Sequence, residues 1–251
     1  MYPPKLLCLF LSVIVVVSLA GCAKYDKQGD LPQGSVAITF DDHFVDNWFK
    51  YLPLLDSFNA KVTFFVDDYT KLTTEQKAKL VIIQQHGHEI GYHTINHFDL
   101  VKYLAKHSMK ELLDTEIMSG LDAMHKDGIY PKTFAYPFGS HVLELDVALT
   151  KIFKSVRMLN GSKNYSKSVV RGDSNQYLFG LGLDNSSGHP EKLYDRMLEG
   201  VRNTNSCVVF VGHMIGEKNT TLQVPAERLR NILRKANELN LRFYTASEIS
   251  N

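Results

Sequence analysis

Two adjacent carboxylates, Asp41 and Asp42, close an apolar run that begins at Ser35. Successive side chains of a β-strand point to opposite faces, so an irregular turn is needed to aim both carboxylates into one pocket. Carboxylates held that close raise each other's pKa unless a cation lies between them. The pair therefore indicates one carboxylate that holds a metal ion and one that stays free to move a proton. The alternative is an exposed Asp-Asp loop start.

A second group of candidate metal ligands is formed by His93 and His97. Imidazoles four residues apart on one helical turn face the same way and can bind a single divalent ion, with Asp42 as an oxygen ligand. Thr94 is predicted to tie down the chain between them through its hydroxyl. Two histidines and one aspartate leave coordination positions open, as catalytic sites do. The set suits Zn²⁺, and Co²⁺, Ni²⁺ or Mn²⁺ could occupy an expanded site.

Short β-rich runs alternate with helical patterns along the chain, which is typical of parallel strands joined by crossover helices. Strands are predicted over residues 35–40, 61–66, 87–92, 133–136, 155–158, 177–183, 207–212 and 241–245. Helices are predicted over residues 46–58, 73–85, 108–125, 143–153, 191–203 and 224–239. Residues 160–175 are polar and predicted to form a surface loop. This alternation, without internal repeats, predicts a single α/β domain with a barrel of parallel strands.

In such a barrel the chemistry lies at the carboxyl ends of the strands. Several polar or turn residues fall just past predicted strand ends: Asp41, Asp42, His93, Phe138 and His213. We therefore expect these residues to meet at one mouth of the barrel.

The N-terminal residues are expected to lie outside this domain. After Lys5, residues 6–19 form an apolar run that is too short for a membrane span and typical of an export signal. Residues 19–22, Leu-Ala-Gly-Cys, resemble the bacterial lipoprotein processing box, with an ordinary signal-peptide cleavage site as the alternative. We expect a signal peptide over 1–21, a tether over 22–34 and the folded domain over 35–251. The protein would then be exported to the bacterial cell envelope and anchored in a membrane through a lipidated Cys22.

Charge and cysteine content exclude some functions. The formal net charge is +1 and no Lys/Arg block stands out, so no nucleic-acid partner is expected. Of the three cysteines, Cys8 and Cys22 lie in the N-terminal segment, so the folded body keeps Cys207 and holds no internal disulfide. Cys207 is predicted to be a buried thiol, and the protein is expected to act as a monomer.

Four motifs, in their order and spacing, resemble those of the polysaccharide deacetylases, carbohydrate esterase family four. They are Thr39-Phe40-Asp41-Asp42, His93-Thr94-x-x-His97, Tyr136-Pro137-Phe138-Gly139 and Val208-Val209-Phe210-Val211-Gly212-His213. The resemblance runs from Ser35 to about Ile249. It implies a distorted, incomplete (β/α) barrel that uses a divalent metal ion to remove acetyl groups from N-acetylated sugars. The implied partner is an acetylated glycan outside the cytoplasm.

The resemblance also implies roles for individual residues. The implied metal ligands are Asp42, His93 and His97. Asp41 would be the general base, His213 the general acid, and the backbone N–H of Phe138 would help to hold the oxyanion. Asp184 lies where the family often has a carboxylate that orients the acid histidine, although a plain turn aspartate is an equal interpretation.

Two positions depart from the family pattern. Ala135 stands where the family commonly has an arginine that braces the catalytic aspartate. Without a nearby cation, Asp41 should be less firmly placed and more basic. Either activity is then reduced, or another residue such as Arg171 or Arg157 reaches in. His43 stands where a small residue is expected and is interpreted as a histidine on the outer rim, with a substrate contact or a further metal ligand as alternatives.

The helix predicted over residues 46–58 carries an aromatic stripe. The stripe is predicted to face the core, with a sugar-stacking platform as the alternative; it consists of Trp48, Phe49, Tyr51 and Leu52.

The same catalytic residues would serve an acetyl-ester hydrolase on a plant polysaccharide. A carbohydrate-binding lipoprotein on a decayed deacetylase scaffold is the non-enzymatic alternative, but a pure binder has no need of Asp41 and His213. Catalysis is therefore favoured.

Overall fold

The computed structural model describes residues 33–171, 175–218 and 220–250. The predicted signal peptide, Cys22 and nearly all of the tether lie outside the described residues. In the part of the chain that is described, no helix has the length and apolar character to cross a membrane.

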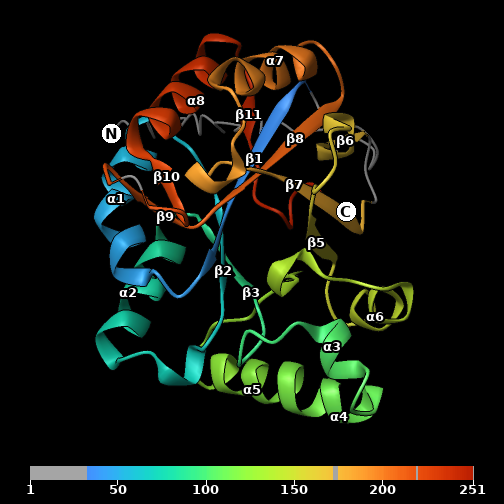
Figure 1. The fold of residues 1–251 in the computed structure, drawn as a ribbon. Coiled ribbons are helices and arrows are strands. Elements are labelled where there is room, and N and C mark those ends of the chain that lie inside the picture. Colours follow the sequence, from blue (N-terminus) through green and yellow to red (C-terminus); the bar gives the residue numbers. More distant parts are fainter. Residues whose placement is uncertain (1–32, 172–174, 219, 251) are drawn as a thin grey trace, which may run out of the picture.

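Within the described residues, seven parallel strands close a barrel, because β8 pairs with β1 at the end of the series (Figure 1). They are β1 Ser35–Asp42, β2 Thr63–Val66, β3 Glu89–Tyr92, β4 Thr133–Ala135, β5 Ser155–Leu159, β7 Tyr177–Gly182 and β8 Ser206–Gly212. The ring lacks one strand of a complete eight-stranded (β/α) barrel. The predicted incomplete barrel in a single domain is thus confirmed.

Short strands extend the ring. β11 Arg242–Phe243 pairs in parallel with the start of β1, and β6 Val169–Arg171 pairs antiparallel with β8. After β8, strands β9 Met214–Gly216 and β10 Gln223–Pro225 form a separate pair. The prediction that residues 160–175 form a loop is wrong for β6, because the β-branched side chain of Val170 is buried there.

Helices cover the outside of the barrel (Figure 1). They are α1 Val45–Ser57, α2 Thr74–Gln85, α3 Leu100–Leu104, α4 Met109–Leu112, α5 Ser119–Lys126, α6 Leu143–Leu149, α7 Glu191–Val201 and α8 Ala226–Glu238. The helix predicted over 108–125 is a composite, since the π-helical segment Leu113–Met118 lies between α4 and α5. α3 was not predicted. Short 3₁₀ turns are found at Tyr69–Lys71, Pro137–Gly139, Tyr165–Ser168 and Asn185–Ser187.

Side chains along β1 alternate between the outer core and the inside of the barrel. Val36, Ile38 and Phe40 point outward into the core between strands and helices. Ala37 packs inside the barrel, in a second apolar cluster that includes the buried thiol predicted at Cys207. By the same alternation, the side chain of Asp41 points into the barrel at its mouth.

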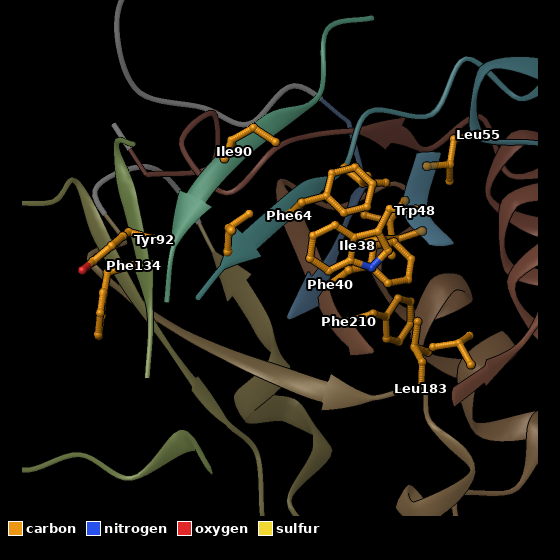
Figure 2. Close-up of a cluster of buried hydrophobic side chains, with 14 of the residues drawn as sticks. Ile38, Phe40, Trp48, Leu55, Phe64, Ile90, Tyr92, Phe134, Leu183 and Phe210 are labelled. Carbon is orange, nitrogen blue, oxygen red and sulfur yellow. The ribbon is translucent and has the colours of Figure 1, made fainter. Parts of the chain in front are cut away.

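Trp48, the first residue of the stripe predicted on α1, lies in the outer core (Figure 2). Trp48 is fully buried and its ring lies 4.9 Å from that of Phe64, centroid to centroid. Leu52 lies one turn further along the same buried face. The core-facing prediction is therefore confirmed for Trp48 and Leu52, while Phe49 and Tyr51 are half-buried against the same core. Truncation of a buried tryptophan to alanine typically costs about 3–5 kcal/mol.

Candidate active site

Asp41 and Asp42 reach the same mouth because the end of β1 is irregular. Alternation alone would point Asp42 outward, but its φ of 81° is left-handed, a conformation that turns the chain sharply. This is the irregular turn that the sequence requires. His93 is the first residue after β3, and His213 is the first residue after β8.

Asp42, His93 and His97 offer ligand atoms around one point. Asp42 Oδ1 lies 3.6 Å from His93 Nε2 and 3.4 Å from His97 Nε2. Ligands bound tetrahedrally at zinc distances are about 3.3 Å apart. Asp42 Oδ1 is also buried and has no hydrogen-bond partner among the described residues. A buried carboxylate oxygen in that state fits a cation as its missing partner.

The protonation states of His93 and Asp42 also favour metal binding. Burial lowers the pKa of His93 to about 3, so its imidazole is neutral, as a ligand must be. Its Nδ1 lies 2.8 Å from the carbonyl oxygen of Ala135, which leaves Nε2 facing Asp42. Burial, with Asp41 nearby, raises the pKa of Asp42 to about 6, and a bound cation would reverse that shift.

The segment between the two histidines is a loop, so the prediction of one helical turn is wrong. Thr94 and His97 have left-handed φ values of 68° and 54°. The predicted role of Thr94 is confirmed, because its hydroxyl accepts a hydrogen bond of 2.9 Å from the His97 N–H. The two imidazoles converge through this loop conformation and not through helical spacing.

Arg157 supplies the cation that Ala135 lacks. Ala135 of β4 and Arg157 of β5 are paired in register, so both side chains point into the barrel. The fully buried guanidinium forms an ion pair with Asp41. Burial alone would raise the pKa of Asp41, but the charge of Arg157 holds it below the ordinary value. Of the two alternatives that the sequence left open, a more basic Asp41 or an arginine that reaches in from elsewhere, the structure confirms the second with Arg157. Arg171 is exposed on β6.

Hydrogen bonds fix His213 at its backbone N–H, at its backbone carbonyl and at its imidazole ring. Asp184 Oδ2 lies 2.6 Å from His213 Nδ1, and Asp184 Oδ1 accepts a hydrogen bond of 3.1 Å from the His213 N–H. The Trp48 indole N–H donates to the His213 carbonyl at 3.0 Å. Burial by itself would lower the pKa of His213, but the bond to Asp184 raises it to about 9. The side chain of Asp184 thus orients a histidine and does not cap the turn that follows.

Phe138 and His43 lie at the rim. Phe138 has a left-handed φ of 59°, is 64% exposed and packs edge-on against the His97 ring at 4.8 Å. His43 Nδ1 lies 2.7 Å from Asp67 Oδ1, which is a hydrogen-bond distance and shorter than the spacing of two metal ligands. His43 is exposed, in agreement with the rim histidine that the sequence predicted.

Sequence reasoning missed Asn47, which fixes β9, the strand directly after His213. Its side-chain amide donates to the Ile215 carbonyl at 2.8 Å, and its side-chain oxygen accepts from the Ile215 N–H at 2.7 Å. The two residues are 168 positions apart, so no local pattern announces the contact.

Comparison with known proteins gives the chain a family context. Residues 28–153 match the family model described as polysaccharide deacetylase. A peptidoglycan-N-acetylglucosamine deacetylase from Bacillus cereus is 33% identical over 105 residues, which cover 41% of this chain and 46% of that protein. The uncharacterized protein YlxY from Bacillus subtilis is 36% identical over 103 residues, which cover 41% of this chain and 30% of that protein. The chain spans less than half the length of these two relatives.

The fold has a solved counterpart. The structure of the peptidoglycan deacetylase PdaC from Bacillus subtilis superposes with a TM-score of 0.59 at 19% identity. The superposition covers 88% of this chain and 91% of that chain. At this level of identity the likeness establishes a shared barrel fold.

Proposed function

The chain belongs to the polysaccharide deacetylase family, and from that premise we propose that it is a metal-dependent hydrolase that removes acetyl groups from N-acetylated sugars of a glycan. One observation carries the proposal. The ligand set of Asp42, His93 and His97 lies beside two residues whose protonation states are complementary, Asp41 and His213. A binding protein on the same scaffold has no use for that complementarity.

The proposed metal site uses neutral imidazoles and the orphaned Asp42 oxygen. A divalent ion bound there would polarise the acetyl carbonyl and acidify water, which is the chemistry that an unreactive amide needs. Zn²⁺ suits two imidazoles and one carboxylate, although Co²⁺, Ni²⁺ or Mn²⁺ fit the same donor types.

Asp41 serves as the general base in this proposal. Its pKa is below the ordinary value of 3.8, so at neutral pH it is a carboxylate that can accept a proton from the attacking water. The ion pair with Arg157 fixes its direction at the cost of some basicity.

His213 serves as the general acid. With its pKa raised to about 9 it carries a proton at neutral pH and can protonate the departing amine. Environments that push the pKa values of two groups apart in this way are typical of acid and base pairs. The backbone N–H of Phe138, whose ring packs against His97 at the rim, would stabilise the negative charge on the carbonyl oxygen.

We place this activity outside the cytoplasm, with the protein held to a bacterial membrane through Cys22. The support is the apolar export signal and the lipoprotein-like residues 19–22.

The experiment measures acetate release from chitooligosaccharides, peptidoglycan fragments and acetylated xylan, each with and without a chelator. Acetate from at least one N-acetylated glycan, lost with chelator and restored by Zn²⁺, is the expected result. Release from xylan alone would assign an esterase, and no release from any of the three would contradict a hydrolytic function.

A further inference from the structure

The composite helix that begins with α4 and ends with α5 contains the π-helical segment Leu113–Met118. Such segments insert an extra residue into a helical turn and are frequent at functional sites. Glu116 lies within it and is only 1% exposed, although carboxylates are almost never fully buried unless they are paired. This burial needs an explanation that the helix alone does not give.

The carboxylate of Glu116 is directed at a single residue of the ligand loop. Its Oε2 accepts a hydrogen bond of 3.3 Å from the Asn96 backbone N–H, and its Oε1 accepts one of 2.8 Å from the Asn96 side-chain amide. Asn96 stands directly before the ligand His97 and three residues after the ligand His93. Glu116 therefore holds the middle of the segment that carries both imidazoles.

That segment requires an external restraint. Thr94, a β-branched residue, and His97 both have left-handed backbones. Residues in such conformations persist where their surroundings over-determine them. The Thr94 hydroxyl restrains the loop from within, through its bond to the His97 N–H. Glu116 restrains it from the neighbouring helix.

The helix is itself fixed to the strand before the loop. The Tyr92 hydroxyl, at the end of β3, donates a hydrogen bond of 2.6 Å to the Glu116 backbone carbonyl. One turn further, Gly120 lets the Tyr92 ring approach, since a side chain there would overlap the hydroxyl. One residue of the helix thus bonds to the chain on both sides of His93.

We propose that Glu116 is a positioning residue that holds the 93–97 loop in the conformation in which both histidines face Asp42. The proposal rests on the metal site of the proposed function. Its direct consequence is that Glu116 raises metal affinity without touching the metal or the substrate.

The test is the Zn²⁺ affinity of the variant Glu116→Gln, measured without substrate by competition with a chromophoric chelator. Glutamine keeps the volume and one acceptor oxygen, but its NH₂ group replaces the other acceptor and would face an Asn96 donor. We expect a loss of about tenfold or more, as for other groups that orient metal ligands indirectly. The matched control is Glu111→Gln on the same helix, where the carboxylate pairs with His107 on the surface at 2.8 Å. The control should bind Zn²⁺ as the wild type does.

A second pair of variants separates positioning from general stability. Asn96→Asp should also weaken Zn²⁺ binding, because two carboxylates would then face each other. In the double variant Asn96→Asp/Glu116→Gln, the new amide can donate to the new carboxylate and still accept the backbone N–H. Recovery of Zn²⁺ affinity, with a Co²⁺ absorption spectrum like that of the wild type, is the expected result.

Wild-type affinity in Glu116→Gln would overturn the inference, and so would a loss that the double variant does not restore. A wild-type protein that binds Zn²⁺ but releases no acetate would contradict the proposed function and leave the role of Glu116 intact.

Discussion

Arg157 stands opposite Ala135 across the β4–β5 pair, and its guanidinium forms an ion pair with Asp41. The position where the family commonly has arginine is thus vacant, and the neighbouring strand fills the vacancy in the same layer of the barrel. Alanine at position 135 also leaves room for a long side chain to lie across the interior.

Exchanging the two residues tests this relationship. Arg157→Ala should reduce kcat at least tenfold and destabilise the fold by about 3–5 kcal/mol, because it leaves a buried carboxylate unpaired. The double variant Ala135→Arg/Arg157→Ala moves the guanidinium back to β4 and should recover part of both losses. Acetate release and chemical unfolding measure the two effects. If Arg157→Ala alone keeps full activity, Asp41 needs no cation.

The pH dependence of kcat/KM should show two limbs. The base must be deprotonated, so activity falls as the pH drops through the pKa of Asp41, which lies below 3.8. The acid must be protonated, so activity also falls as the pH rises through about 9, the pKa of His213. Asp184→Asn removes the group that raises the His213 pKa, and the alkaline limb should move to lower pH. An alkaline limb that does not move would remove Asp184 from this role.

Zn²⁺ should stabilise the folded protein, because an ion that binds only the native state shifts the unfolding equilibrium. The melting temperature should rise with added Zn²⁺ in the wild type and in Asp41→Asn, but not in His93→Ala. Asp41→Asn should in addition lose activity at least about a hundredfold, since it removes the base and spares the ligands. Full Zn²⁺ content in His93→Ala, by elemental analysis, would contradict the ligand assignment.

Cys22→Ser should move the protein from the membrane fraction to the soluble fraction of cells, because serine cannot be lipidated through a thioether. Cys8→Ser is the matched control, since Cys8 lies within the predicted export signal, and its distribution should stay that of the wild type. Immunoblots of both fractions give the answer, and an unchanged distribution of Cys22→Ser would count against the anchor.

The sequence predicts those parts of the molecule that depend on local order. The strands follow from apolar runs, and the capping box of Thr73 and Gln76 correctly begins α2. The irregular end of β1 follows from two carboxylates that must share a pocket. Each of these depends on residues that are near neighbours in the chain.

Other features depend on register and could not be predicted. Arg157 and Asp41 are 116 positions apart, and only the pairing of β4 with β5 makes Arg157 a better neighbour than Arg171. The left-handed backbone of Thr94 has no sequence signal, because threonine is not a residue that prefers it. The loop that contains it is bonded at Asn96 to Glu116, twenty residues further along the chain.

The direction of β1 has a consequence for how the enzyme would meet its substrate. The strand enters the barrel at Ser35, and its carboxylates lie at the opposite end, roughly 20 Å further on. Any attachment through the N-terminus would therefore join the barrel at the end opposite the candidate site. A tether over 22–34 could extend by at most about 45 Å, which would set the distance from a membrane within which such an anchored protein could reach a glycan.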